Sequence, residues 1–178
     1  MAKIVSDTSN STPFTTVPAD WYPLRIVRVE KTVSKPKPDG TGNNPMLVFG
    51  FDIEGYSKDP KLNKRQINFY NVVIGGSDKN GAPNSLNRLI EIIWASGIPW
   101  DHRNCGSEDM GKPPVEDKQE AAWICPECGK SLNEPNTLIA YDVDMFRGRM
   151  VKGQVVVGKM LGTDEPRNEL RRVRPLNS

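Results

Sequence analysis

The chain has 178 residues and a formal net charge of +2, from 24 Lys and Arg against 22 Asp and Glu. This length suits one domain of ordinary size with room for an insertion. No apolar run is long enough to span a membrane, and the first residues lack the basic and then apolar profile of a signal peptide. The sequence therefore indicates a cytoplasmic protein with reduced cysteines and without membrane contact.

Charge is distributed unevenly along the chain. Residues 145–178 hold eight Lys and Arg against three acids, whereas residues 101–134 hold eight acids against four bases. This asymmetry indicates that a basic C-terminal part and an acidic internal part meet different partners.

The first half of the chain reads as a polar arm followed by three strands. Residues 1–18 are rich in Ser and Thr and predict a flexible arm. A β-rich segment at 21–33 changes the parity of its apolar residues, which predicts a bulge near 26–28. Alternating apolar residues predict a second strand at 46–54 and a third at 65–74.

One helix and two further strands follow. Apolar residues at helical spacing predict a helix over 85–96, with Ser85 as its N-cap and a glycine after its last turn. Beyond an insertion at 99–135, residues 149–161 and 169–176 read as long strands.

All three cysteines and the only histidine lie close together, as His102-x-x-Cys105 and Cys125-Pro-Glu-Cys128. Two pairs with two-residue gaps allow tight turns to offer four ligands to one tetrahedral Zn²⁺. Four protein ligands leave no open position for a substrate, so the sequence predicts a structural zinc site. Two alternatives stay open: Asp101 could replace His102 as a ligand, and the CxxC pair could be a redox couple.

Three strands, one helix, an insertion and two strands are the element order of the OB-fold, a five-stranded Greek-key barrel. Glycines inside the predicted strands suit strands that curl around a barrel. We therefore expect a mainly β, OB-fold-like barrel, with one helix after the third strand, built from residues 19–98 and 136–178. Its small zinc-binding insertion covers 99–135. An SH3-like or other α+β arrangement would fit the same element order.

Several segments together resemble the single-stranded DNA-binding proteins of tailed phages, an OB-fold family. They are WYPLRIVRVEKTVSKP (21–36), PMLVFGFDIEGY (45–56), SLNRLIEIIWASGI (85–98), and the closing pair FRGRMVKGQVVVGKML (146–161) and RNELRRVRPL (167–176). The resemblance covers about residues 19–97 and 144–175, and the zinc insertion is not a general feature of the fold. It implies binding of single-stranded DNA during phage DNA replication or recombination, in the host cytoplasm.

Single-strand binding needs cations along the phosphates and exposed rings on which bases stack. In an OB barrel the groove runs across the second and third strands and between two flanking loops. The predicted contacts are outward-facing tyrosines and basic side chains of strands and loops: Tyr22, Tyr56, Tyr70, Arg25, Arg28, Lys31, Lys35, Lys37, Lys61, Lys64, Arg65, Lys152, Lys159, Arg167, Arg171 and Arg172. Further candidates are Arg174 for phosphate contact and Trp21 and Trp100 for stacking.

The acidic insertion holds few large apolar residues, so metal coordination is expected to supply the folding free energy that burial cannot. Its negative charge makes it a poor DNA-binding element. We expect it to contact replication or recombination proteins, or a second copy of the chain.

The leading expectation is a non-catalytic protein that protects or organises single-stranded DNA. The alternative is a replication or recombination adaptor whose barrel and zinc insertion bind protein rather than nucleic acid. An enzyme is disfavoured, because the sole histidine is assigned to the metal and no P-loop occurs. The nearest approach to a carboxylate pair is Asp142 with Asp144.

Overall fold

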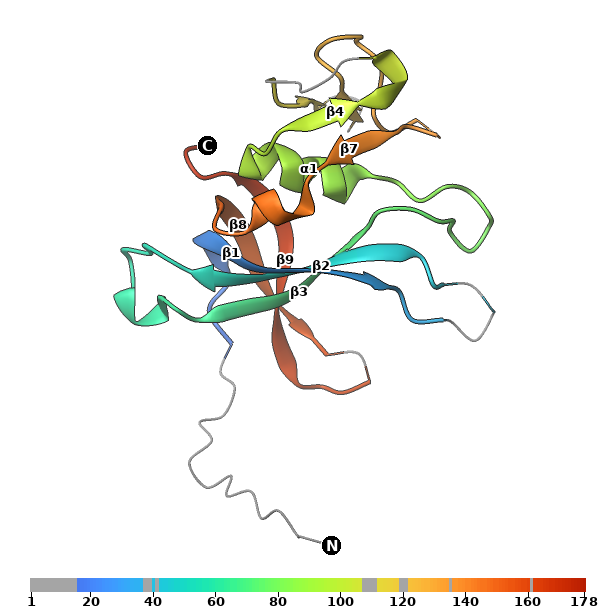
Figure 1. The fold of residues 1–178 in the computed structure, drawn as a ribbon. Helices are drawn as coiled ribbons and strands as arrows, with labels where there is room; N and C mark the ends of the chain where they lie inside the picture. Colours follow the sequence, from blue (N-terminus) through green and yellow to red (C-terminus); the bar gives the residue numbers. More distant parts are fainter. Residues whose placement is uncertain are drawn as a thin grey trace, which may run out of the picture.

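The long strands form one antiparallel sheet in the computed structural model (Figure 1), which describes residues 16–36, 40, 42–106, 112–118, 122–134, 136–160 and 162–178. The sheet contains β1 (Asp20–Val33), β2 (Pro45–Ile53), β3 (Gln66–Val73), β8 (Met150–Lys159) and β9 (Pro166–Pro175). They pair in the order β3-β2-β1-β8-β9. The predicted mainly β class and its five long strands are confirmed, although β9 begins before the predicted residue 169.

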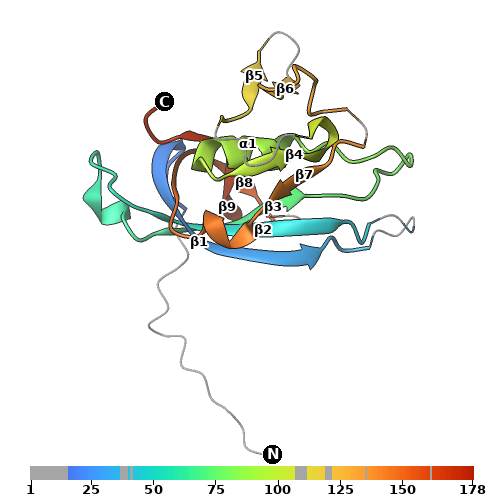
Figure 2. The same cartoon turned by 45° about the horizontal axis from the view of Figure 1, so that its top comes forward.

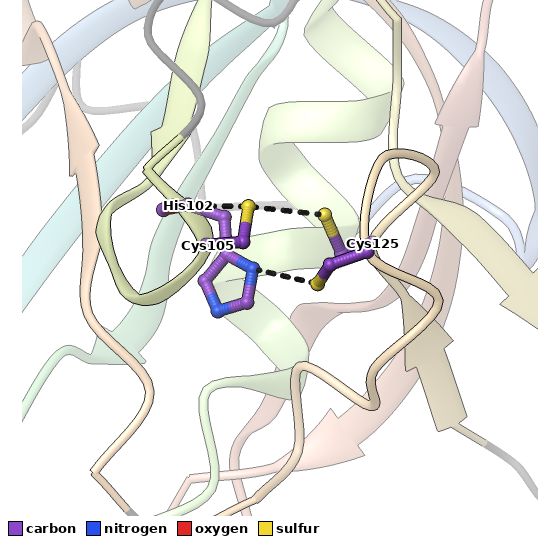
Figure 3. Close-up of side chains that lie close together, drawn as sticks. His102, Cys105 and Cys125 are labelled. Carbon is purple, nitrogen blue, oxygen red and sulfur yellow. Dashed lines mark hydrogen bonds between the residues drawn. The ribbon is translucent and has the colours of Figure 1, made fainter.

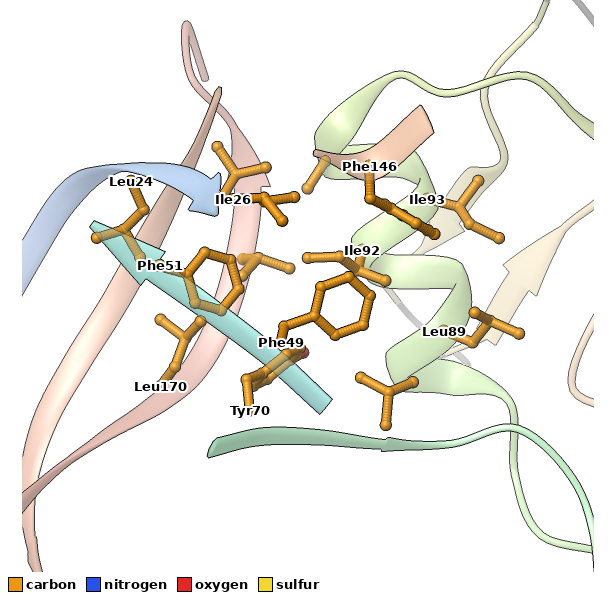
Figure 4. Packing of buried hydrophobic residues seen from close by; sticks show 14 of the residues in the cluster. Leu24, Ile26, Phe49, Phe51, Tyr70, Leu89, Ile92, Ile93, Phe146 and Leu170 are labelled. Atoms are coloured by element: carbon orange, nitrogen blue, oxygen red, sulfur yellow. The ribbon is translucent and has the colours of Figure 1, made fainter. Parts of the chain in front are cut away.

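The alternating apolar side chains of β2 form the centre of the hydrophobic core (Figure 4). The buried side of this strand carries Leu47, Phe49, Phe51 and Ile53. The ring of Phe49 meets that of Phe146 edge-on, with 5.1 Å between the ring centroids. Full burial of each such side chain contributes roughly 1.5–3 kcal/mol, so this face of β2 is a main source of stability.

Register shifts interrupt three of the strand pairs. In β1 the shift lies between Ile26 and Arg28, which confirms the predicted bulge. In β3 the two residues at 68–69 lie opposite the single residue Gly50. In β9 the extra residue is Arg171, at the shift between Gln154 and Val155 of β8. Each bulge increases the local twist and changes which residues of its strand face the core.

The helix α1 (Asn87–Ser96) covers the space between the two edge strands of the sheet. The edges β3 and β9 approach each other, although no hydrogen-bonded ladder joins them in the described part of the chain. The helix packs chiefly on β9 and also contacts β3 and β8. Its apolar stripe is buried as predicted, including Leu89, Ile90 and Ile93.

The ends of α1 show one confirmed and one incorrect expectation. Gly97 has a φ of 61° and ends the helix in the left-handed conformation, as the sequence predicts. The N-cap is Leu86 rather than Ser85. The Ser85 hydroxyl accepts a hydrogen bond from the Asn87 N–H at 3.3 Å, but Ser85 lies one residue before the observed N-cap.

The insertion folds into two short antiparallel pairs on the α1 side of the sheet (Figure 2). The first pair joins β4 (Trp100–His102) to β7 (Ile139–Tyr141), and the second joins β5 (Val115–Asp117) to β6 (Ala122–Ile124). The short 3-10 helix η2 (Arg103–Cys105) follows β4. Because β7 pairs with β4, the inserted unit extends beyond the predicted boundary at residue 135.

The segments before β1 and before β8 connect to the sheet. Most of the expected arm at 1–18 lies outside the described residues, but Val17 is buried and exchanges two hydrogen bonds with the Asn168 side chain of β9, at 2.8 and 2.9 Å. The 3-10 helix η3 (Val143–Phe146) brings Phe146 into the core ahead of β8. No helix among the described residues is long and apolar enough to cross a membrane.

A matched pair of glycine substitutions tests the packing of β8. A Cβ atom at Gly153 would lie 2.4 Å from Cδ1 of Leu24 and 2.6 Å from Cδ1 of Leu170, both in the core. We expect Gly153→Ala to lower the free energy of unfolding by about 1–3 kcal/mol through overpacking. At Gly158 the Cβ would meet only the carboxylate end of Glu169, which can move away. Denaturant unfolding should therefore show a smaller loss for Gly158→Ala, and an equal loss would contradict this account.

Candidate metal centre and basic face

Four ligand-type side chains converge between η2 and the Cys-Pro-Glu-Cys turn (Figure 3). The ligand atoms of His102, Cys105, Cys125 and Cys128 all lie within 4.8 Å of one another. The Cys105 and Cys125 sulfurs are 3.9 Å apart, and the Cys128 sulfur is 3.5 Å from Nδ1 of His102. The structure therefore brings together all four residues that the sequence pairs by spacing.

These separations fit a tetrahedral metal ion rather than a disulfide. Bonds of about 2.3 Å to sulfur and about 2.0–2.1 Å to nitrogen place two sulfurs about 3.8 Å apart and a sulfur and a nitrogen about 3.5 Å apart. A disulfide requires sulfurs about 2.05 Å apart, and all three cysteines are free. The cluster can hold one metal ion in an N-and-three-S ligand set.

Local backbone turns aim the ligands. After Cys125, the Gly129 N–H donates to the Cys125 carbonyl at 2.9 Å, while the Cys125 N–H donates to the Lys130 carbonyl at 3.0 Å. Gly129 has a φ of 71°, a left-handed conformation that suits glycine. These bonds close the turn and hold Cys125 and Cys128 on one side of it.

The surroundings of the cluster favour uncharged ligands in the absence of an ion. Burial raises the pKa of the Cys125 thiol, and burial together with nearby Lys130 lowers the pKa of His102. A bound cation reverses the preference at the thiol, because it stabilises the thiolate directly. Metal binding at this site therefore releases protons from its cysteines.

The insertion is attached to the sheet by an ion-pair network that sequence analysis missed. Arg172 of β9 donates from Nε to Glu91 of α1 at 3.3 Å and from a terminal nitrogen to Glu116 of β5 at 3.1 Å. Glu91 also accepts the Val173 N–H at 3.3 Å. Burial raises the pKa of the Glu91 carboxyl. Arg172 was predicted to contact DNA, and the structure gives it this connecting role.

An aromatic contact supports the same attachment. The rings of Trp94 in α1 and Trp123 in β6 are tilted against each other with 5.3 Å between their centroids. Trp123 lies two residues before Cys125, so this contact places the metal cluster beside the helix.

The three tyrosines predicted to face outward are buried, and that prediction is wrong. Tyr22, Tyr56 and Tyr70 are 0%, 9% and 2% exposed. Tyr22 shares the parity of Leu24 and therefore enters the core. Tyr70 turns inward because the bulge at 68–69 changes the parity of β3. None of the three rings can stack on a nucleic-acid base in this conformation.

Tyr22 and Tyr56 form a polar contact at the start of β1 instead. Their ring centroids are 4.5 Å apart, and the Tyr56 hydroxyl donates to Asp20 at 2.6 Å. Lys58 pairs with the same carboxylate at 2.7 Å. Hydrogen bonds from Lys58, Tyr56 and the Trp21 N–H lower the pKa of Asp20 from 3.8 to about 2.

Basic side chains gather on the outward face of β1, β8 and β9 rather than on β2 and β3. Strand pairing aligns Trp21 with Gln154 and Arg172, and Pro23 with Lys152 and Arg174. The Arg174 guanidinium lies over the Trp21 ring at 5.1 Å from the centroid. This surface, with Arg25 at its edge and exposed Arg171 beside Arg172, is called the basic face below.

Two members of the basic face are held by carboxylates. Arg25 forms a two-point ion pair with Glu54, in which one contact is 2.7 Å. Arg172 is the other, through its contacts with Glu91 and Glu116. Lys152 donates to the Ser178 carbonyl at 2.9 Å. Arg174 and Trp21 were both candidates from the sequence, and the structure brings them into contact.

The other predicted cations lie elsewhere, so the set does not form one trough. Lys31 and Lys35 lie near the β1–β2 connection, and Arg28 faces outward beside Gly50. Lys61 lies within η1 (Pro60–Leu62), and Lys64 and Arg65 follow it. At the β8–β9 hairpin, Lys159 pairs with Asp164 and Arg167 pairs with Glu169, both at 2.9 Å. Lys37 lies outside the described residues.

The comparisons with known proteins give no relative from which a role could be taken. No protein-family model, curated protein or solved structure matches the chain.

Alanine substitution of two neighbouring residues, one at a time, tests which of them binds the metal. His102 is buried beside Cys128, whereas Asp101 forms an ion pair with Arg103 at 3.3 Å. We expect His102→Ala to weaken metal binding by more than about tenfold, since loss of outer hydrogen-bond partners alone costs about 10–100-fold. Asp101→Ala should bind metal nearly as the unchanged protein does. Titration against a chromogenic chelator measures both, and a larger effect of Asp101→Ala would reverse the assignment.

The Asp20 contact predicts a pH-dependent difference in stability. The folded pKa of about 2 lies below the ordinary value of 3.8, so the stabilisation is present above that value and is lost as the pH falls toward 2. Asp20→Asn should thus be less stable than the unchanged protein at neutral pH, and the difference should vanish in acid. Denaturant unfolding across this range measures it. Asp164→Asn, at an exposed surface ion pair, should change stability little at neutral pH.

Proposed function

We propose that the chain is a non-catalytic protein that binds single-stranded DNA with little sequence preference, on an OB-type barrel stapled by a structural zinc ion. The observation that carries the proposal is the basic face, where Arg174 lies over the half-buried indole of Trp21 and Lys152 lies on the neighbouring strand. Cations for phosphates and an aromatic ring at the surface are what binding of unpaired strands requires.

Three features of the sheet support the OB-type barrel. The order β3-β2-β1-β8-β9 brings the fourth long strand of the chain beside the first, as Greek-key closure requires. The free edges β3 and β9 approach each other, and α1 packs beside both. Bulges in β1, β3 and β9 supply the extra twist that closure needs.

The proposed DNA path differs from the one expected across the second and third strands. The outward face of β2 and β3 carries uncharged or acidic side chains, such as Val48, Asp52 and Asn68. The basic face lies on β1, β8 and β9 instead, and the single-stranded DNA passes over Trp21 there. Stacking there rests on one indole, since the three predicted tyrosines are in the core.

Zinc is the ion best suited to the metal centre. One imidazole and three thiolates form a soft ligand set, and tetrahedral Cys3His sites are typical of structural zinc. Four protein ligands complete the coordination, so the ion supplies folding free energy and no reaction. His102 and Cys105 would bind it from the β4–η2 side, and Cys125 and Cys128 from the turn.

A protein-binding adaptor is the second candidate function, and a groove of about 660 Å³ favours it. The groove lies between β1, β4, β7 and η3, and its lining holds three acids, Asp101, Asp142 and Asp144, against two bases, Lys31 and Arg103. A basic segment of a replication or recombination protein, or of a second copy of the chain, fits this charge.

Salt-dependent binding to an oligo-dT strand tests the leading proposal. With Lys152, Arg171 and Arg174 on phosphates, the plot of log affinity against log salt should have a slope of about −2, from about 0.7 per phosphate contact. The double substitution Lys152→Ala and Arg174→Ala should reduce the slope by more than half. Lys79→Ala, in the exposed β3–α1 loop, is the matched control. Fluorescence anisotropy that detects no binding of dT at low salt would refute the proposal.

A further inference from the structure

The β5–β6 hairpin of the insertion stands over α1 (Figure 2). A second pocket lies between this hairpin, α1 and β9. Its volume is about 430 Å³, within the range of pockets that hold small ligands. The lining side chains are Asn87, Glu91, Glu116, Lys118, Ala122, Trp123, Arg172 and Arg174. Neither the sequence pattern nor the metal centre accounts for this pocket.

The pocket lining holds two carboxylates and three cations, for a formal net charge of +1. Glu91 and Glu116 both bind Arg172, with contacts of 3.3 and 3.1 Å. No carboxylate among the described residues forms an ion pair with the other two cations, Lys118 from the insertion and Arg174 from β9. The pocket therefore offers two positive side chains from opposite walls to an anionic ligand.

The carboxylates do not cancel this attraction. Glu91 is 8% exposed and its carboxylate is oriented by Arg172 and by the Val173 N–H. Glu116 is oriented by the same guanidinium. Arg172 is thus held between the two acids, and Lys118 and Arg174 are the lining cations that remain for an anionic ligand.

The pocket is also continuous with the basic face. Arg174 belongs to both, because its guanidinium lies over the Trp21 ring and the residue also lines the pocket. A strand that follows β8 and β9 past Trp21 therefore reaches the pocket without leaving positively charged surface.

We infer that this pocket holds one phosphate-bearing nucleotide unit of the bound strand, with its phosphate between Lys118 and Arg174. The inference rests on the proposed function. It gives the acidic insertion a part in nucleic-acid binding, through a single lysine on the wall that faces β9.

Substitution of Lys118 tests the site with the full protein and a dT oligomer. Lys118→Ala should reduce the salt slope by about 0.7, the value of one phosphate contact to a single strand, and Lys118→Glu should weaken binding further. Lys112→Ala is the matched control, because Lys112 lies on the same insertion and pairs with Glu127 at 3.5 Å, outside the pocket. Anisotropy titrations between about 50 and 200 mM salt measure all three.

The outcomes separate the inference from the function beneath it. A smaller slope for Lys118→Ala with an unchanged slope for Lys112→Ala supports the pocket. Equal slopes for the unchanged protein and both Lys118 variants overturn the pocket and leave DNA binding by the basic face intact. Equal losses for Lys118→Ala and Lys112→Ala also overturn it, since they indicate a general effect of charge. An unchanged protein that binds no dT refutes the proposed function itself.

Discussion

The double pairing of β1 is the constraint on which the rest of the fold depends. Its first residues, from Asp20 to Arg25, pair with β8, while the stretch from Leu24 to Val33 pairs with β2. The two pairings overlap only at Leu24 and Arg25, and the bulge at Val27 adds twist just beyond this overlap. This twist places the outward face of β1 beside the outward faces of β8 and β9, and the three together form the basic face.

The insertion is held by polar side-chain contacts and by the four residues of the metal cluster, rather than by a hydrophobic core of its own. Its β5–β6 strands contribute few large buried side chains, of which Trp123 is one, packed against Trp94. Arg172 joins it to helix and sheet at once, and the four-ligand cluster fixes its turns. Burial of the ion-paired Glu91 costs desolvation free energy. Its ion pair with Arg172 therefore fixes the position of the insertion more than it stabilises the protein.

Local sequence patterns predicted the elements and the metal ligands, because both are set by short-range spacing. The five long strands, the helix and the convergence of His102 with the three cysteines were foreseeable in this way, whereas the short strands of the insertion were not. The predicted tyrosine contacts failed because strand parity is easily misassigned: Tyr22 shares the parity of Leu24, and an unforeseen bulge turns Tyr70. The Arg172 network and Lys118 depend on contacts between residues more than fifty positions apart, which no local pattern encodes.

The position of Cys125 directly after β6 has a consequence for how the protein responds to oxidants or to a shortage of metal. The five-stranded sheet owes its stability to apolar burial and contains none of the thiols. If the cluster holds a metal ion, its loss should weaken the β5–β6 wall of the second pocket while the sheet stays folded. Ligand affinity would then fall gradually without global unfolding.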